Sequence, residues 1–267
     1  MIIGEKINSS LTKVRVAIEK RDAEPIVALA SAQLETGAAY LDVNAGAFLD
    51  DEPEMLSWLV SAIQRNLDFD VRLSLDSSNS LAIKAALQAN KSKKPIINSI
   101  TAQKRRLDGV LPLIKEYGAS VVALCMDDGG IPDTAVGRVK IAAHILDRLT
   151  GEGIGYEDIY LDPIVTPIRV DPHGARIAVD AIAEIRKNWP AAHIICGLSN
   201  ISYGTPARAH LNRAFLAAAA FAGLDSAIMD PLDQQLMATV YAIDALAGND
   251  AGCAKYIKAF REGVFGL

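Results

Sequence analysis

The feature that most constrains the fold is a regular alternation of short apolar runs with helical segments. Eight apolar runs fit buried strands, at residues 1–7, 39–43, 71–75, 95–97, 120–125, 159–161, 192–196 and 226–229. Helices are expected between them, at residues 24–36, 53–66, 80–88, 104–117, 133–149, 174–188, 207–223 and 234–247, with a last one at 251–262. Such alternation predicts a parallel sheet whose faces are covered by helices.

Eight strand–helix units in a chain near ~250 residues predict an α/β fold, a (β/α)8 TIM barrel formed as a single domain over residues 1–267. The hydrophobic fraction of 51% and the charged fraction of 22% suit one globular domain with a large core. A doubly wound open sheet is the alternative. That fold usually carries a Gly-rich phosphate turn, and no GxGxxG or GxxxxGK[ST] follows any expected strand.

Composition also bounds the partners and the compartment. The net charge is −5 and no Lys/Arg-rich run occurs, so we expect no nucleic-acid partner. The three cysteines are scattered without metal or redox spacing, which predicts a reducing compartment such as the cytoplasm. No secretory signal opens the sequence, and the longest apolar run, residues 214–224, is too short for a bilayer and predicts a buried helix.

Most of the expected strands end in a carboxylate or an amide. The residues concerned are Glu5, Asn8, Asp42, Asn44, Asp76, Asn98, Asp127, Asp162, Asn200 and Asp230. In a barrel the carboxyl ends of all strands meet at one face, where active sites lie, so these side chains are predicted to converge. Asp and Asn also end strands as turn and cap residues, which explains any single member. The whole set fits that explanation less well, because ordinary capping would use more Ser and Thr.

Such a ring predicts a small, nitrogen-rich ligand. The strand ends carry few cations, so the core of the ligand is not a phosphate. Carboxylates accept hydrogen bonds from N–H groups, and amides both donate and accept, so the ligand must supply a matching edge. A guanidine-like heterocycle with a neighbouring carbonyl, as in a pterin, has this edge. A metal ion is the competing occupant of an acidic cluster, but no histidine ligands or tight Asp/Glu spacing support it. We therefore expect no bound metal.

An ordered set of motifs covers nearly the whole chain and closely resembles the methyltetrahydrofolate:corrinoid-protein methyltransferases. These belong to the pterin-binding, dihydropteroate-synthase-like barrels, and the folate module of cobalamin-dependent methionine synthase is similar. The motifs are Ile3-Gly4-Glu5-Lys6-Ile7-Asn8, Leu41-Asp42-Val43-Asn44, Leu75-Asp76-Ser77, Ile97-Asn98-Ser99, Met126 to Pro132, Leu161-Asp162-Pro163, Gly197-Leu198-Ser199-Asn200, Arg208 with Asn212-Arg213-Ala214-Phe215-Leu216, and Gly223-Leu224-Asp225-Ser226-Ala227-Ile228.

The resemblance implies methyl transfer between N5 of (methyl)tetrahydrofolate and the cobalt of a corrinoid (cobalamin) carried on a separate protein. It implies that Asp76, Asn98 and Asp162 hold the pterin ring and that Asn200, the predicted catalytic residue, reaches N5. An amide is not a strong acid near neutral pH, so Asn200 is expected to polarise and orient N5 while water supplies the proton. No corrinoid-binding Asp-x-His-x-x-Gly occurs in this chain, and the direction of transfer stays open.

The remaining predicted substrate-binding residues come from the same strand ends: Glu5, Asp42, Asn44, Met126, Gly197, Ser199, Arg208 and Met229. Arg208 is expected to meet an anionic part of the folate, or else to be a solvated residue at a helix start. Asp42 and Asn44 are expected beside or behind the pterin, and Glu5 in a salt bridge or against the ligand. For the two methionines, core packing is the alternative. Lys6 and Arg213 are weaker candidates for the glutamate tail.

Two alternatives remain for the function. Dihydropteroate synthase shares the fold, but by family pattern it needs a Ser-Arg-Lys-type ending on the seventh strand, where this chain has Leu198-Ser199-Asn200-Ile201. This chain also lacks the Met-His dipeptide that the synthase pattern has at the fifth strand, since Met126-Asp127 stands there. The second alternative is a non-catalytic folate-binding subunit. A homodimer is predicted through the Ala-rich helix at 214–223 and the last helix.

Overall fold

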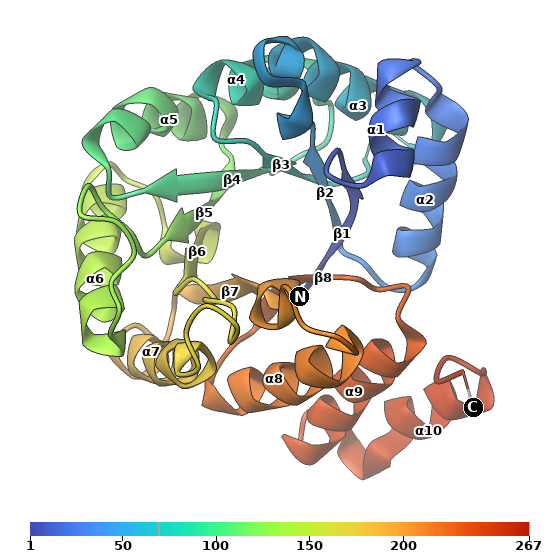
Figure 1. Cartoon of the computed structure of the whole chain (residues 1–267), viewed down its shortest axis with the longest axis vertical. Helices are drawn as coiled ribbons and strands as arrows, with labels where there is room; N and C mark the ends of the chain where they lie inside the picture. The colour runs from blue at the N-terminus through green and yellow to red at the C-terminus, as the bar shows by residue number, and fades with distance from the viewer. Residues whose placement is uncertain (69, 267) are drawn as a thin grey trace.

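A closed barrel of eight parallel strands forms the centre of the molecule (Figure 1), in a computed structural model that describes residues 1–68 and 70–266. The strands follow chain order around the barrel, and β8 pairs with β1. They are β1 (Ile2–Asn8), β2 (Tyr40–Asn44), β3 (Leu73–Asp76), β4 (Ile96–Thr101), β5 (Ser120–Leu124), β6 (Ile159–Asp162), β7 (His193–Gly197) and β8 (Ser226–Met229). The predicted (β/α)8 barrel is confirmed.

Helices form an outer ring around the strands, and α9 and α10 extend beyond it beside α8 (Figure 1). They are α1 (Thr12–Glu19), α2 (Ala23–Glu35), α3 (Glu52–Asn66), α4 (Ser80–Ala89), α5 (Lys104–Tyr117), α6 (Ala135–Gly151), α7 (Gly174–Asn188), α8 (Arg208–Ala222), α9 (Gln234–Leu246) and α10 (Ala254–Arg261). Short 3-10 turns lie at η1 (Gly46–Asp51), η2 (Tyr156–Asp158), η3 (Leu198–Ser202) and η4 (Ala251–Cys253).

The boundaries predicted from sequence differ from these by a few residues, with one omission and one overstatement. Helix α1 was not predicted, although Val14, Ala17 and Ile18 are buried at helical spacing. The expected burial of the apolar run in α8 holds for one face only. Phe215 is buried, whereas Phe221 is 60% exposed. The described residues include no helix that is both long and apolar enough to cross a membrane.

Alternation along the strands decides which side chains enter the barrel. A small hydrophobic cluster fills the interior: Ile3, Tyr40, Ile96, Val122, Tyr160, Ile195 and Ile228. Because side chains on a strand repeat their direction every two residues, the residues two positions later also point inward. On six of the strands these are Glu5, Asp42, Asn98, Leu124, Asp162 and Gly197. An apolar floor therefore lies under a mostly polar upper layer.

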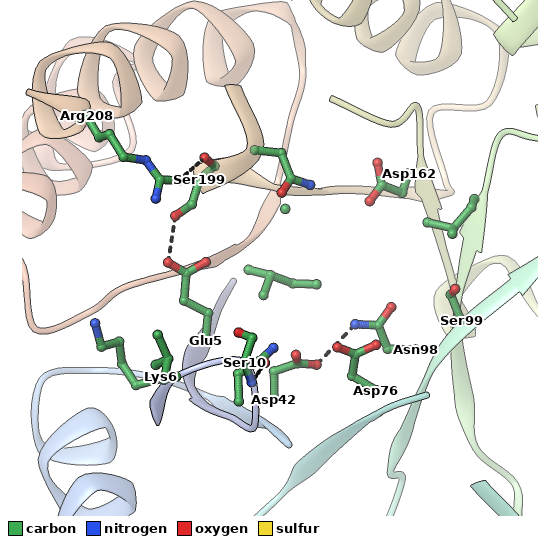
Figure 2. Close-up of a pocket in the computed structure, with 16 residues that line it drawn as sticks. Glu5, Lys6, Ser10, Asp42, Asp76, Asn98, Ser99, Asp162, Ser199 and Arg208 are labelled. Atoms are coloured by element: carbon green, nitrogen blue, oxygen red, sulfur yellow. Dashed lines mark hydrogen bonds between the residues drawn. The ribbon is translucent and has the colours of Figure 1, made fainter. Parts of the chain in front are cut away.

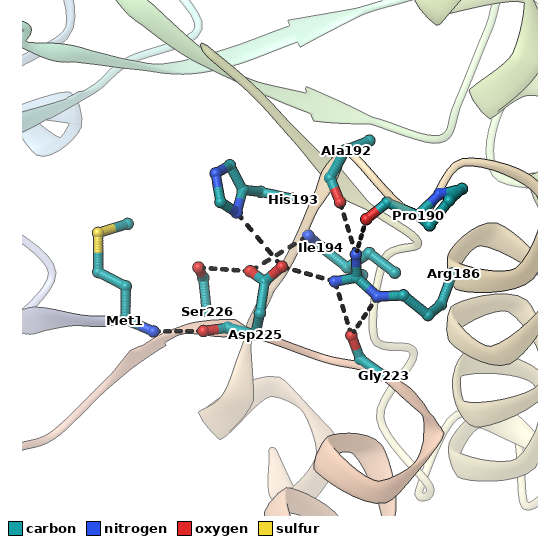
Figure 3. A network of polar contacts seen from close by, with 9 residues as sticks. All are labelled: Met1, Arg186, Pro190, Ala192, His193, Ile194, Gly223, Asp225 and Ser226. Carbon is teal, nitrogen blue, oxygen red and sulfur yellow. Dashed lines mark hydrogen bonds and ion pairs between the residues drawn. The ribbon is translucent and has the colours of Figure 1, made fainter. Parts of the chain in front are cut away.

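Polar contacts close the opposite, N-terminal end of the barrel (Figure 3). Arg186 on α7 donates hydrogen bonds to the carbonyl oxygens of Gly223, Pro190 and Ala192, at 2.9–3.1 Å. Its guanidinium also pairs with Asp225 at 2.6 Å, and the same carboxylate lies 3.3 Å from Nδ1 of His193. These contacts tie the starts of β7 and β8 to α7, far from the carboxyl ends of the strands.

Candidate active site

A cavity of about 460 Å³ opens at the carboxyl ends of the strands. Its lining includes nine of the predicted site residues (Figure 2): Glu5, Asp42, Asp76, Asn98, Asp162, Gly197, Ser199, Asn200 and Arg208. Six of these residues come from six different strands, Ser199 and Asn200 come from η3, and Arg208 is the first residue of α8. The predicted convergence of carboxylates and amides on one mouth is therefore present in the fold.

The carboxylate and amide side chains of the neighbouring strands β2, β3 and β4 form a row that contains two hydrogen-bonded pairs, of which Asp42 with Asn98 is drawn in Figure 2. Oδ1 of Asp42 accepts from Oγ of Ser74 at 2.7 Å and from Nδ2 of Asn98 at 3.1 Å. Oδ2 of Asp76 accepts from Nδ2 of Asn44 at 2.9 Å. The amide nitrogens of Asn98 and Asn44 thus each donate to a protein carboxylate, which fixes the orientations of both amides. The Asn98 carbonyl oxygen remains available at the cavity as a hydrogen-bond acceptor.

Burial dominates the protonation of this row. Desolvation, with the nearby Asp76 carboxylate, raises the pKa of Asp42 well above its ordinary range, against the hydrogen bonds from Ser74 and Asn98. Desolvation also raises the pKa of Asp76 to about 6, although the Asn44 hydrogen bond and the Arg106 charge oppose the shift. Asp76 is therefore expected to be mostly ionised near neutral pH, whereas burial disfavours the charged form of Asp42 more strongly.

Asp162 ends β6 and stands across the cavity from this row (Figure 2). It is only 7% exposed, and its Oδ1 accepts a hydrogen bond from the backbone N–H of Ile164 at 2.7 Å. Desolvation raises the pKa of Asp162 to about 7, and the N–H groups of Ile164 and Gly197 and the charge of Arg138 limit the rise. This carboxyl group can exchange a proton close to neutral pH.

The loop after β7 is fixed from two sides (Figure 2). Oγ of Ser199 donates to Oε1 of Glu5 at 2.6 Å. Nη2 of Arg208 donates to the Ser199 carbonyl oxygen at 2.6 Å, and its Nε donates to Oγ of Ser202 at 3.0 Å. Desolvation raises the pKa of Glu5. Arg208 therefore fixes η3 through these two hydrogen bonds and also lines the cavity, a structural role that was not predicted from the sequence.

Gly197 leaves the space that Asn200 occupies. A Cβ atom at residue 197 would lie 3.0 Å from Nδ2 of Asn200, closer than an ordinary contact. The φ of Gly197 is −73°, so the glycine is required by space and not by backbone conformation. Among the described residues, no hydrogen-bond partner holds the exposed Asn200 amide. This amide is free to contact a ligand.

Three predicted site residues lie outside the cavity lining. Asn44 donates a hydrogen bond from its amide to Asp76 and does not itself line the cavity. Met229 is fully buried in the core between β8 and the helices, and Met126 is a half-buried residue after β5. Ile228 and Leu124 line the cavity instead. Ile228 has the inward phase of β8, which is the sequence signal that the prediction for Met229 missed. Met126 lies outside the lining because β5 ends at Leu124, two residues earlier.

Other parts of the lining were weaker candidates or were missed. Lys6 lines the cavity, but its Nζ pairs with Oδ2 of Asp230 at 2.9 Å. Arg213 turns back onto its own helix, where Nε donates to the Ala209 carbonyl oxygen. Ser10 and Leu11, which follow β1, and Ser99, which lies within β4, also line the cavity, and no distinctive residue pattern marks them in the sequence. Within residues 1–68 and 70–266, no group of three or more His, Cys, Asp or Glu side chains has the geometry of a metal site.

Comparison with known proteins identifies the family to which the chain belongs. Residues 5–230 match the family described as pterin binding enzyme. The chain belongs to the pterin-binding enzymes. Among solved structures, this pterin-binding enzyme is similar to the dihydropteroate synthase of Xanthomonas albilineans in complex with 7,8-dihydropteroate, with a TM-score of 0.66, 19% identity, and coverage of 94% of this chain and 93% of that one. The Vibrio fischeri ES114 enzyme gives a TM-score of 0.68 at 14% identity, covering 92% and 93% of the two chains. At these identities the likeness concerns the fold alone.

Sequence relatives divide the family more finely. This pterin-binding enzyme is 36% identical over 269 residues to the methylcorrinoid:tetrahydrofolate methyltransferase of Eubacterium limosum, with 100% of this chain and 98% of the relative covered. It is 30% identical over 242 residues to methionine synthase of Mycobacterium tuberculosis (strain ATCC 25618 / H37Rv). That match covers 86% of this chain but only 20% of methionine synthase, so the chain corresponds to about one module of the larger protein.

Proposed function

We propose that this protein is a methyltransferase that moves a methyl group between a corrinoid carried on a separate protein and N5 of tetrahydrofolate. One observation carries the proposal. Asp76, Asn98, Asp162 and Asn200 line a single cavity in a chain that is 36% identical, over its full length, to a methylcorrinoid:tetrahydrofolate methyltransferase. We write the reaction in the direction that the relative's name gives, from methylcorrinoid to tetrahydrofolate.

The upper layer of the barrel suits the pterin ring. Ionised Asp76 and Asp162 accept hydrogen bonds from the ring and amino N–H groups, and the Asn98 carbonyl oxygen accepts another. Asn98 donates a hydrogen bond to Asp42. This bond fixes the amide orientation in which the Asn98 carbonyl oxygen faces the ligand. Leu124 on β5, between the strands of Asn98 and Asp162, and Ile228 on β8 supply apolar contacts for the ring faces. The carboxylates are thus used as acceptors for a neutral, donor-rich edge.

Asn200 suits the reacting nitrogen. The methylcorrinoid supplies a methyl group, and both electrons of the cobalt–carbon bond stay with cobalt when the methyl group leaves. N5 uses its lone pair to form the new N–CH3 bond and then releases its proton, so atoms and charge balance. The Asn200 amide orients N5 toward the incoming methyl group, and a water accepts the proton or passes it to the Asp162 carboxylate, whose pKa is about 7.

The rim of the cavity suits a protein partner that presents the corrinoid. Exposed apolar side chains stand on several loops at the carboxyl ends of the strands, at Leu11, Leu49, Ile131, Val170 and Tyr203, and on the first turn of α4, at Leu81. Leu49 and Val170 are 76% and 75% exposed. Apolar side chains around a polar cavity are typical of a surface that a second protein covers. A corrinoid protein docked here would bring its cofactor to the mouth.

Dihydropteroate synthase is the less supported alternative. It needs cations for a pyrophosphate, and the two basic side chains in the cavity already have protein partners: Lys6 pairs with Asp230, and Arg208 binds Ser199 and Ser202. A non-catalytic folate-binding subunit does not require Asn200 at the mouth. Full-length similarity to a methyltransferase supports catalysis over both alternatives.

The experiment that separates these functions uses three incubations of the purified protein. Tetrahydrofolate with methylcobalamin, followed by the cobalt absorbance, is expected to yield methyltetrahydrofolate and Co(I). Pterin pyrophosphate with p-aminobenzoate is expected to yield no dihydropteroate. Titration with tetrahydrofolate alone is expected to show binding. Formation of dihydropteroate would show that the protein is a dihydropteroate synthase. Binding of tetrahydrofolate without methyl transfer from methylcobalamin or any corrinoid protein would show that it is a non-catalytic folate-binding subunit.

A homodimer and a cytoplasmic location are further parts of the proposal. Phe221 on α8, with Ile257 and Phe260 on α10, leaves apolar surface exposed on the helices predicted to form the dimer face. Two of the three free cysteines are buried in the core, which suits a reducing compartment. Light scattering that gives the mass of one chain would remove the dimer, and Phe221→Glu is expected to convert a dimer to monomers.

A further inference from the structure

Arg138 is a charged residue buried almost completely, at 1% exposure, behind the wall of the cavity. It lies in the first turns of α6, outside the barrel, and does not contact the cavity. A buried guanidinium is costly unless all its N–H groups are paired, so its partners indicate what it does. These partners are not carboxylates. Arg138 donates to three backbone carbonyl oxygens and one hydroxyl group.

Three of the four partners lie in the loop that directly follows Asp162. Nη1 of Arg138 donates to the carbonyl oxygens of Pro163, at 3.0 Å, and Ile164. Nη2 donates to Oγ1 of Thr166 at 3.0 Å. The fourth bond runs from Nε to the Pro132 carbonyl oxygen at 3.0 Å, which anchors the guanidinium to the β5–α6 loop. One side chain therefore fixes the start of the β6–α7 loop.

A single peptide unit connects this anchor to Asp162. The carbonyl oxygen of Pro163 and the N–H of Ile164 belong to the same planar group. Its oxygen accepts from Arg138, and its N–H donates to Oδ1 of Asp162 at 2.7 Å. Fixing the oxygen fixes the direction of the N–H, and a hydrogen bond at one end polarises the other. Arg138 thus acts on the carboxylate without touching it.

The backbone at Ile164 needs such an anchor. Its φ is +63°, in the left-handed region that β-branched residues rarely adopt. This conformation turns the Ile164 N–H back onto the carboxylate, and it persists only where the surroundings hold it. The hydrogen bonds from Arg138 to both carbonyl groups that flank this residue supply that hold.

We propose that Arg138 is a positioning residue for methyl transfer, which holds the Asp162 carboxyl in the orientation that tetrahydrofolate requires by clamping the Pro163–Ile164 peptide. The proposal rests on the proposed function and assigns a role in it to a residue outside the cavity. A related arrangement recurs on the neighbouring helix. Arg106 on α5 donates to the carbonyl oxygens of Ser77, Ser78 and Ser99, which directly follow Asp76 and Asn98.

The charge of Arg138 also reaches Asp162. The groups that face this carboxyl are the guanidinium on α6, the N–H groups of Ile164 and Gly197, and the thiols of Cys125, directly after β5, and Cys196 on β7. Burial raises the pKa of both thiols, so they are neutral. Arg138 is the cation that lowers the pKa of Asp162 toward its value of about 7. Removing the clamp is expected to raise this pKa further.

Two substitutions separate the clamp from the charge, and a third controls for lost stability. Arg138→Lys keeps the charge but cannot reach four acceptors, and Arg138→Met removes both. Arg186→Lys is the matched control, because Arg186 also binds three backbone carbonyl groups but at the other end of the barrel (Figure 3). For each variant, kcat/KM for methyl transfer to tetrahydrofolate, the equilibrium affinity for tetrahydrofolate and the melting temperature are measured from pH 5.5 to 8.5.

Lower melting temperatures are expected for all three variants. Only the Arg138 variants are expected to lose kcat/KM, about tenfold or more at pH 7, with the acidic limb of the profile moved to higher pH. The shift of this acidic limb should be larger for Arg138→Met than for Arg138→Lys. The pH below which the affinity for tetrahydrofolate weakens should shift by a similar amount. If Arg138→Met does not fold, Arg138→Lys and Thr166→Val, which removes one acceptor, provide the test.

The proposal would be overturned if folded Arg138→Lys kept the acidic limb of the wild type in its pH profile. It would also be overturned if Arg186→Lys shifted that limb by as much as Arg138→Lys does. Failure of the proposed function looks different, because the wild-type protein would then transfer no methyl group to tetrahydrofolate at any pH. In that case the affinity for tetrahydrofolate still tests the clamp. If the pH dependence of the tetrahydrofolate affinity is the same in Arg138→Lys as in the wild type, Arg138 does not position the Asp162 carboxyl.

Discussion

Asp162→Asn is predicted to make the protein more stable at alkaline pH. The Asp162 carboxyl is 7% exposed and has a pKa of about 7. An aspartate in an unfolded chain has a pKa of about 3.9. Below pH 4 the group is protonated in both states and burial costs little. Between about pH 4 and pH 7 the group is ionised in the unfolded chain but still mostly protonated in the folded protein, because burial disfavours the charge. The free energy of unfolding of the wild type therefore falls as pH rises through this interval.

The size of the effect follows from the two pKa values. A difference of roughly three pKa units corresponds to about 4 kcal/mol between acid and alkaline limits. Between pH 5 and pH 8 the change amounts to roughly 2–3 kcal/mol, because part of the cost already acts at pH 5. Asparagine keeps an oxygen for the Ile164 N–H but carries no charge, so its contribution does not change with pH.

The assay is the melting temperature of the wild type and Asp162→Asn at pH 5 and pH 8. For a chain of this size we expect the gain from the substitution to be roughly 5–10 °C larger at pH 8 than at pH 5. Asp128→Asn, in an exposed loop, is the control and is expected to show no such growth. An equal gain at both pH values, or a gain confined to pH 5, would refute the assignment of a buried, reluctantly ionised carboxyl.

Two further substitutions test how the site is held. Gly197→Ala places a Cβ atom 3.0 Å from Nδ2 of Asn200, so we expect kcat to fall about tenfold while the affinity for tetrahydrofolate changes little, as single-turnover kinetics and a binding titration would show. Unchanged kcat would mean that the Asn200 amide has no fixed place in the reaction. Asn44→Ala removes the 2.9 Å hydrogen bond to Asp76 and raises its pKa above about 6, so the affinity should weaken roughly 5- to 30-fold, most at acid pH, in a titration between pH 5.5 and 8. A uniform loss across that range would contradict this role.

The fold could be predicted from the sequence because its signal is periodic. Apolar runs recur eight times, and a barrel is the natural closure for that many parallel strands. Helix α1 escaped the prediction because it is short and mostly charged on its outer face. The burial of Val14 and Ile18 shows that tertiary packing, more than local preference, stabilises it.

Some residues of the candidate site could likewise be predicted from the sequence and others could not. Carboxylates and amides at strand ends could be identified because a barrel brings those ends together. Whether a particular residue faces the cavity depends on strand phase, which a shift of one residue reverses, as Met229 and Ile228 show. Arg138 could not be found from sequence at all. An arginine in the first turns of a helix is usually solvated, and only packing shows that this one is buried on carbonyl groups.

The central claim is that this cavity transfers a methyl group between N5 of tetrahydrofolate and cobalt, with Asn200 acting on N5. The most direct test follows that transfer with cobalamin for wild type and Asn200→Ala in parallel, together with the folate affinity of each. We predict transfer by the wild type, and in Asn200→Ala a rate that is lower by a factor on the order of 10²–10³, with tetrahydrofolate still bound. Equal rates in the two proteins would contradict the role of Asn200. A wild type that binds folate but transfers no methyl group, to free cobalamin or to any corrinoid protein, would contradict the function itself.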